Sequence, residues 1–284
     1  MATISITEDV KEALLRVASE LQLKLGRKVD LDEAIRYLLS GSLERRKFLS
    51  TILDSKESPR MFSIVGETWN PIYGCLHNCQ YCWARKLARD RLRNSRKYSN
   101  GFQPNLDERE LKREFKPGGV VFVSDMGDIF SPGVEDEWIE RVIEHVSRFP
   151  QTYFLFLTKN PFRYHEFSFP SNSILGATIE TNRDMKEVSR APPPSERYEA
   201  MRKLEWPLKF IAVEPILDFD PEILAKWIKE IDPVMVYIGY DNYNNKLLEP
   251  PIRKTERLIE AVKAEGIIVF RKTIRPAWNE DLYL

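Results

Sequence analysis

The sequence predicts an α/β protein: a partial barrel of the (β/α)6 type with a small strand–helix–helix module at its N-terminus. Three observations predict this fold. Short apolar runs alternate with amphipathic helical patterns from residue 61 onward. The runs are nearly continuous in hydrophobic residues, as strands buried on both faces must be. The roughly six strand–helix units are too few for a closed eightfold barrel.

The strand–helix units are predicted to build one parallel sheet. Repeated strand–helix units imply a parallel sheet with right-handed crossovers. Functional side chains are then expected at the carboxyl ends of the strands and in the loops that follow. The predicted strands are 61–66, 119–125, 153–159, 174–180, 208–216, 235–240 and 267–272, and the predicted helices are 79–94, 135–148, 195–205, 221–231 and 254–265.

Composition sets the protein class. The chain has 284 residues, 43% of them hydrophobic and 30% charged, which is typical of a globular protein. Lysine plus arginine and aspartate plus glutamate balance at 43 each, so the total charge neither favours nor excludes a nucleic-acid partner. No apolar run reaches the roughly 18 residues of a membrane helix, and the N-terminus lacks a signal-peptide pattern. We therefore expect a cytoplasmic protein with no membrane segment.

The N-terminal part has a pattern of its own. We predict three regions: a module at residues 1–42, a charged and partly helical linker at 43–60, and the barrel at 61–284. In the module, residues 3–7 alternate as a strand, with Ile4 and Ile6 on one face, and two helical patterns follow.

Strand, helix, helix in this length resembles the ribbon-helix-helix family. That resemblance implies a homodimer in which two strands pair and enter the DNA major groove. The outward residues would be Thr3, Ser5 and Thr7, which are short and uncharged and poorly suited to reading bases. A helical cap or a dimerisation module without DNA therefore stays an open alternative.

All three cysteines of the chain lie within eight residues, spaced Cys75-x-x-x-Cys79-x-x-Cys82. An odd number in one cluster favours metal binding over a disulfide framework. Three thiolates can bind three irons of a [4Fe–4S] cluster and leave the fourth iron open. The alternative is a Cys₃His zinc site that includes His77, although ligands this close on both sides of His77 would be cramped.

The motif resembles that of the radical SAM superfamily in its cysteine spacing, in the aromatic Tyr81 before the last cysteine, and in its place between the first strand and the first helix. The flanking TWNP…GC…NCQYCWA is similar to a phage-derived radical SAM family of unknown function, distantly related to spore photoproduct lyase. The resemblance implies S-adenosylmethionine as cofactor, an external one-electron reductant of flavodoxin or ferredoxin type, and an unidentified substrate. The N-terminal module at residues 1–42 makes DNA or another nucleic acid a candidate substrate or tether.

The resemblance also implies where S-adenosylmethionine binds. Ser124 and Asp125 stand at the end of the second strand, where the superfamily binds the methionine amino group, although an aspartate that caps the turn is an equal alternative. Thr178 and Glu180 share one face at the end of the fourth strand and are candidate ribose ligands. Arg197 is the candidate for the methionine carboxylate, against the alternative of a solvated helix arginine.

Glu214 and Tyr240 are the candidate catalytic residues. Glu214 interrupts a buried strand, and a lone buried carboxylate needs a partner or a role. Lys159 and Asp241 also fall at strand ends. The sequence thus predicts an enzyme that cleaves S-adenosylmethionine to a 5′-deoxyadenosyl radical. The alternative is a ribbon-helix-helix DNA-binding regulator with an iron–sulfur sensing domain. Because no other cysteine exists, an auxiliary cluster and a cysteine hydrogen donor are both disfavoured.

Overall fold

The computed structural model describes residues 43–54, 58–278 and 280, together with isolated positions between residues 11 and 31. The strand predicted at residues 3–7 lies outside the described residues, and so does most of the helical pattern up to residue 42. The architecture given below is that of the described part.

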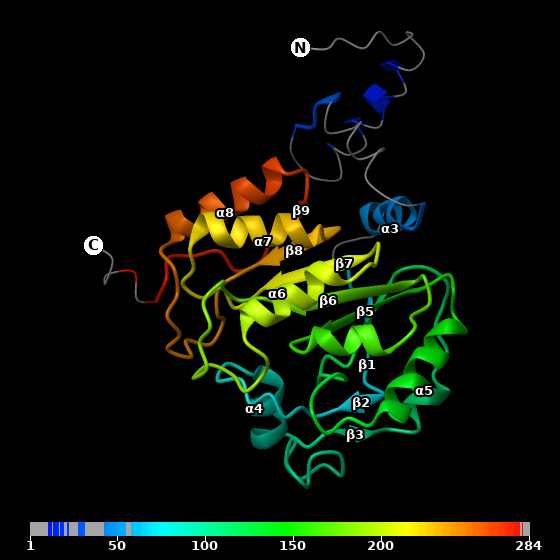
Figure 1. Ribbon diagram of the computed structural model, residues 1–284. Helices are drawn as coiled ribbons and strands as arrows, with labels where there is room; N and C mark the ends of the chain where they lie inside the picture. The colour runs from blue at the N-terminus through cyan, green and yellow to red at the C-terminus, as the bar shows by residue number, and fades with distance from the viewer. Residues whose placement is uncertain are drawn as a thin grey trace.

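A seven-stranded parallel sheet forms the centre of the molecule and curls into a half-barrel (Figure 1). Its strands lie side by side in chain order, and each pairs in parallel with the next. The predicted partial barrel is therefore confirmed. The strands are β1 (Glu67–Trp69), β4 (Val120–Val123), β5 (Tyr153–Thr158), β6 (Ser173–Thr178), β7 (Lys209–Val213), β8 (Met235–Ile238) and β9 (Ile268–Arg271).

Four helices cover the outer face of the curled sheet: α5 (Asp136–Ser147), α6 (Pro194–Lys203), α7 (Pro221–Ile231) and α8 (Ile252–Ala264). Alternate residues of each strand point outward into one large apolar cluster with these helices. The remaining strand residues point inward. Both faces of the sheet are therefore buried, which is why the strands read as continuous apolar runs.

The inner face is filled by α3 (Leu43–Asp54) and by the turns at 58–66. Phe48 of α3 is fully buried, and the Phe62 ring lies 5.2 Å from that of Phe210 and 4.9 Å from that of Tyr237. The prediction of a strand at 61–66 is wrong. This apolar run fills the barrel interior as turns, and the first strand begins at Glu67.

The other elements surround the cysteines. A short antiparallel pair, β2 (Ile72–Tyr73) and β3 (Asn105–Leu106), flanks the segment that leads to α4 (Trp83–Asp90). The helix predicted for 79–94 begins only at residue 83 because residues 79–82 belong to the cysteine loop. Two 3₁₀ turns span Glu110–Lys112 and Pro161–Glu166. Among the described residues, no helix combines the length and apolar character that crossing a membrane requires.

Candidate functional site

A close backbone crossing sets the start of the cysteine loop. Gly74 has a φ of +85°, and a Cβ there would lie 2.1 Å from the carbonyl oxygen of Gln103. Gly127, in the loop after β4, pairs with Gly74 through an isolated bridge, and its own Cβ would lie 2.8 Å from the Gly74 oxygen. Only glycine fits at both positions. The crossing therefore fixes the direction in which Cys75 leaves the strand.

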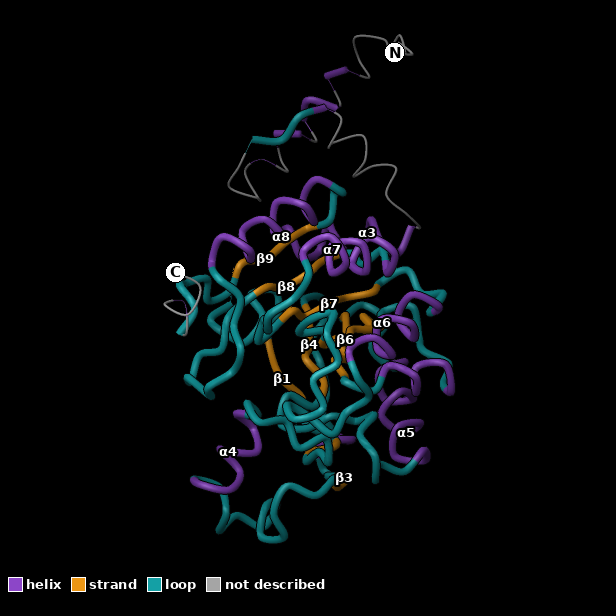
Figure 2. The backbone as a smooth tube through the Cα atoms, turned by 60° about the vertical axis from the view of Figure 1, so that its left-hand side comes forward, coloured by secondary structure: helices purple, strands orange, loops and turns teal. Residues whose placement is uncertain are grey.

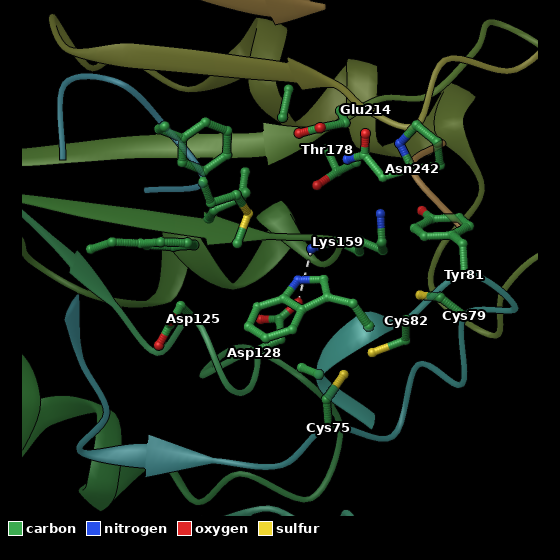
Figure 3. A pocket seen from close by; sticks show the side chains of 18 of the residues that line it. Cys75, Cys79, Tyr81, Cys82, Asp125, Asp128, Lys159, Thr178, Glu214 and Asn242 are labelled. Carbon is green, nitrogen blue, oxygen red and sulfur yellow. Dashed lines mark hydrogen bonds between the residues drawn. The ribbon is translucent and has the colours of Figure 1, made fainter. Parts of the chain in front are cut away.

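Polar contacts hold each cysteine of the loop. The Cys75 sulfur accepts a hydrogen bond from the His77 amide at 3.4 Å, and the Cys82 sulfur accepts from the Arg85 amide at 3.3 Å at the start of α4. The Cys79 sulfur lies 3.3 Å from the Ser189 hydroxyl. All three thiols are free and line one cavity (Figure 3).

These three thiols suit a cluster better than a single ion. Within the part of the chain that the structure describes, no group of three or more His, Cys, Asp or Glu side chains is arranged to hold one metal ion. A four-iron cluster has no such requirement, because each thiolate binds a different iron. Burial raises the pKa of Cys75 and of Cys79, so these thiols need a neighbouring positive charge, such as a metal, to ionise. The donor set therefore fits the predicted cluster.

His77 is directed away from the sulfurs. Its Nε2 lies 3.0 Å from Oδ2 of Asp128, and the side chain is 1% exposed. Asp128 also accepts hydrogen bonds from the Thr158 hydroxyl at 2.8 Å and from the Lys159 amide at 3.0 Å. This buried carboxylate thus ties the cysteine loop to the end of β5. The Cys₃His zinc alternative gains no support from this geometry.

The cavity has a volume of about 540 Å³, within the usual range for small-molecule sites. It lies inside the half-barrel at the carboxyl ends of the strands, where function was expected. One end holds the cysteines and the other reaches the apolar filling of the barrel. Polar side chains stand between these ends, and the lining includes Tyr81, Asp125, Asp128, Lys159, Thr178 and Glu214.

Glu180 organises the wall next to the cysteines. Its Oε1 accepts from Lys159 Nζ at 2.7 Å and from the Tyr81 hydroxyl, and its Oε2 accepts from Arg197 Nη1 at 2.7 Å. The Lys159 ammonium also lies 5.1 Å from the centre of the Tyr81 ring. Residues from the cysteine loop, from the end of β5 and from α6 therefore meet on one carboxylate that follows β6.

Charge pairing decides the ionisation of Glu180. Burial alone would raise its pKa, but the cations of Arg197 and Lys159 together lower the pKa to about 2. Arg197 is 2% exposed, so the alternative of a solvated helix arginine is wrong. Neither Glu180 nor Arg197 is among the residues that line the cavity, whereas Tyr81 and Lys159 are. The predicted ligand pair thus lies just behind the wall.

The other predicted cofactor residues are spread over the strand ends. Thr178 and Asp125 line the cavity. Asp125 accepts from Asn70 Nδ2 at 2.6 Å, and burial raises its pKa. Ser124 has a φ of +60°, and its buried hydroxyl has no hydrogen-bond partner among the described residues. Like Glu180, Ser124 is not among the lining residues.

The two predicted catalytic residues have different surroundings. Glu214 lines the cavity and pairs with Lys272 at 2.5 Å, and burial raises the pKa of its carboxyl despite that cation. The Tyr240 hydroxyl instead lies 2.9 Å from the Pro250 carbonyl and 2.7 Å from the Thr255 hydroxyl, in the interior beside α8. Tyr240 also lines the cavity, so the structure brings both candidates to it, although hydrogen bonds hold the Tyr240 hydroxyl beside α8.

Sequence reasoning missed Asp128 and Lys272 and gave Lys159 too little weight. Asp128 stands three residues after Asp125 in the same VSDMGD segment, so the position after a strand was the available signal. Lys272 and Lys159 each directly follow a strand. Lys159 pairs with Glu180 after the neighbouring strand β6, whereas Lys272 pairs with Glu214 across β8, and one sequence does not reveal the sheet order on which both pairs depend.

Fold and site together define a class: a parallel half-barrel with a cavity at its strand ends, lined by three cysteines of one loop. Residues 62–237 match the family described as "Protein of unknown function (DUF5131)", and the chain belongs to that family. A search of curated proteins by sequence finds no match.

Solved structures share the fold at low sequence identity. Spore photoproduct lyase complexed with dinucleoside spore photoproduct is 11% identical, with a TM-score of 0.51 over 91% of this chain and 95% of that chain. A single-residue mutant of spore photoproduct lyase is 12% identical, with a TM-score of 0.50 over the same shares. A radical SAM methyltransferase from Sphaerobacter thermophilus is 16% identical, with a TM-score of 0.46 over 72% of this chain and 66% of that chain. The two lyase structures confirm the predicted resemblance at the level of fold.

Proposed function

We propose that this protein is a radical SAM enzyme that holds a [4Fe–4S] cluster on Cys75, Cys79 and Cys82. One observation carries the proposal: the three cysteines of the chain all line a single cavity at the strand ends of a parallel half-barrel. Three thiol ligands leave one iron of such a cluster free for a cofactor. The spacing of the motif and the fold shared with spore photoproduct lyase support the same assignment.

A cluster held by Cys75, Cys79 and Cys82 would, when reduced, supply the electron for cleavage of the sulfonium–5′-carbon bond of S-adenosylmethionine. The products would be methionine and a 5′-deoxyadenosyl radical, which would become 5′-deoxyadenosine by taking a hydrogen atom from the substrate. The protein supplies position and exclusion of water. The Gly74 crossing and the Asp128 contacts hold the cysteine loop. The buried apolar filling behind the cavity keeps water from its inner end.

Lys159 is the cation best placed to meet the carboxylate of S-adenosylmethionine. It lines the cavity on the side of Cys79, and its charge opposes the rise in the pKa of that thiol. Glu180 and Arg197 then act as positioning residues, because they fix Lys159 and Tyr81 from behind the wall. Thr178, Asp125 and Ser124 remain our candidates for the ribose and amino groups.

The Glu214–Lys272 pair lies in the same cavity and is our candidate for contact with the substrate. Tyr240 also lines this cavity and stays a candidate for substrate contact through its ring, while its hydroxyl is hydrogen-bonded to Thr255 of α8. A flavodoxin- or ferredoxin-type protein would supply the electron. Nothing in the described residues favours the alternative of a DNA-binding regulator.

The test is anaerobic reconstitution with iron and sulfide, followed by product analysis with S-adenosylmethionine and dithionite. We expect about four irons per chain and formation of 5′-deoxyadenosine. Cys75→Ala, Cys79→Ala and Cys82→Ala should each lose the cluster and the product. Ser171→Ala, at an exposed serine in the loop before β6, is the control and should behave as the wild type. Stoichiometric zinc without iron, or a full cluster without cleavage, would contradict the proposal.

A further inference from the structure

A strongly basic surface follows the cysteine loop. Residues 83–104, which comprise α4 and the turns after it, contain seven lysines and arginines but a single acid, Asp90. The whole chain is neutral, with 43 bases and 43 acids. A local excess of six positive charges in 22 residues is therefore a departure from the rest of the molecule. We call this segment the α4 surface; its bases are Arg85, Lys86, Arg89, Arg91, Arg93, Arg96 and Lys97.

Most of these charges face solvent without an acidic partner. Five of the seven are exposed. Arg89 pairs with its neighbour Asp90 at 3.0 Å, and no ion pair within the described residues engages the other four. Elsewhere exposed arginines meet acids, as Arg148 does with Glu144 and Arg271 with Glu256. The four exposed bases without such a pair are Lys86, Arg91, Arg93 and Arg96.

The α4 surface adjoins the cavity. Helix α4 begins directly after Cys82, and both Trp83 and Phe102 line the cavity. Arg85 of α4 connects the helix with the cavity wall. Its guanidinium donates a hydrogen bond to the Cys75 carbonyl at 3.1 Å and lies 5.8 Å from the centre of the Phe102 ring. Figure 2 shows α4 and its following turns at an edge of the molecule, apart from α7 and α8.

We propose that the α4 surface binds the phosphodiester backbone of a single-stranded nucleic acid and brings one base to the cavity. This inference rests on the proposed function for the cavity and names its substrate class. Five of the seven bases are arginines, whose planar guanidinium pairs with phosphate through two hydrogen bonds. Trp83, the first residue of α4, lines the cavity and offers an aromatic face on which a base can stack.

The cavity size explains the preference for a single strand. About 540 Å³ holds a small molecule and cannot admit a base pair with its duplex, so a base must leave its stack to enter. A competing occupant is the reductant, because electron carriers of this kind are often acidic. The exposed arginines that follow Trp83 of the cavity wall along α4 and its turns favour the nucleic acid, and the experiment separates the two.

The experiment measures binding by fluorescence anisotropy with the full-length, anaerobically reconstituted protein. The probes are single-stranded RNA and DNA of one mixed sequence of about 20 nucleotides, at roughly 50 and 200 mM salt. The test variant carries Lys86→Glu, Arg93→Glu and Arg96→Glu. The control carries Lys226→Glu, Arg253→Glu and Arg257→Glu, which reverse three exposed bases of α7 and α8. The two variants change net charge equally.

We expect the wild type and the control to bind, and the test variant to bind at least about tenfold more weakly. Its salt dependence should fall by about 2 in log–log slope, since each phosphate contact on a single strand contributes roughly 0.7. A larger loss of affinity for RNA than for DNA in the test variant would identify RNA as the ligand, and a larger loss for DNA would identify DNA. Equal affinity and slope in the test variant and the wild type would overturn the proposal.

The reductant is tested in parallel. Formation of 5′-deoxyadenosine is compared with dithionite and with reduced flavodoxin as electron donor. If the test variant binds nucleic acid normally but loses only the flavodoxin-supported product, the α4 surface serves the reductant and the proposal is wrong. If the wild type binds nucleic acid through the α4 surface yet yields no product with either donor, the radical SAM function fails while the binding surface stands.

Discussion

Glu180 is a buried carboxylate that pairs with two cations. A carboxylate that is 2% exposed would ordinarily be costly to ionise, but Arg197 and Lys159 surround it. Removal of one partner from such a buried group leaves the others uncompensated. The loss of stability on substitution here therefore includes the penalty of leaving a buried charge unpaired, in addition to the loss of the hydrogen bond itself.

Glu180→Gln should lower the free energy of unfolding at pH 7 by about 3–5 kcal/mol, because Arg197 and Lys159 lose their counter-charge in the interior. The folded pKa of Glu180, about 2, lies below its ordinary value of 4.5. Its stabilising contribution is therefore complete above about pH 5 and is lost as pH falls towards 2. The difference between wild type and variant should shrink over that same window.

Urea unfolding followed by circular dichroism at several pH values measures this difference. Glu199→Gln is the control, because Glu199 pairs with Arg202 at 2.8 Å on the surface and should show little change. A difference that stays constant between pH 7 and pH 3 would mean that Glu180 is not ionised by its neighbours.

At the scale of residues, the sequence predicted which residues belong to the site, but it did not predict which of them line the cavity and which lie behind its wall. The three cysteines, Tyr81 and Glu214 were predicted to belong to one site, and the structure brings them to one cavity. Glu180 and Arg197 were also chosen, yet they pair with each other behind the wall. A single sequence shows which strand end carries a side chain. It does not show which of two neighbouring layers the side chain occupies.

At the scale of elements, the region predicted as a linker contains α3, which packs into the core of the half-barrel. Its charged sequence hides three apolar positions, Phe48, Leu49 and Ile52, that are all buried against the inner face of the sheet. Phe48 lies 5.1 Å from the ring of Tyr153, the first residue of β5. Arg45 also pairs with Asp232 at 2.7 Å, just before β8. Helix α3 thus closes the amino-terminal end of the half-barrel.

Phe48→Ala should therefore lower the free energy of unfolding by about 3–5 kcal/mol, the usual cost of emptying a fully buried aromatic site. Lys47→Ala, one position earlier on the exposed side, is the matched control and should change it by less than about 0.5 kcal/mol. Denaturant unfolding of both variants gives the comparison. Equal stability of the two would mean that α3 is a linker helix outside the core.

The apolar runs that were correctly predicted as strands are those that pair with a neighbouring strand in the sheet. Six of the seven predicted strands form, because each apolar run pairs with the next in a buried parallel sheet. The run at 61–66 is equally apolar, but it fills the barrel interior and has no ladder to join. The apolar content of a run therefore predicted that the run is buried, whereas forming a strand also required a neighbouring strand with which to pair.

At the scale of the whole molecule, the half-barrel has two ends with different roles. The apolar filling from α3 and residues 58–66 occupies the amino-terminal end, whereas the cysteine loop and the cavity occupy the carboxyl end. Only the carboxyl end places polar side chains from successive strands side by side. This division was predictable from strand–helix alternation alone. The filling was not, because the sequence predicted α3 as part of a linker and residues 61–66 as a strand of the sheet.

The last prediction concerns residues 1–42, whose predicted strand lies outside the described residues. The Ile4 and Ile6 face has no strand partner within so short a segment, so two chains are expected to pair there. A chain beginning at residue 43 keeps α3 and the whole half-barrel. It should retain the cluster and cleavage of S-adenosylmethionine and should be monomeric by light scattering, whereas the full chain should be dimeric. Ile4→Thr with Ile6→Thr in the full chain should also give a monomer, because only the apolar face is removed. If the shortened chain remains dimeric, another surface makes the contact and the ribbon-helix-helix interpretation is wrong.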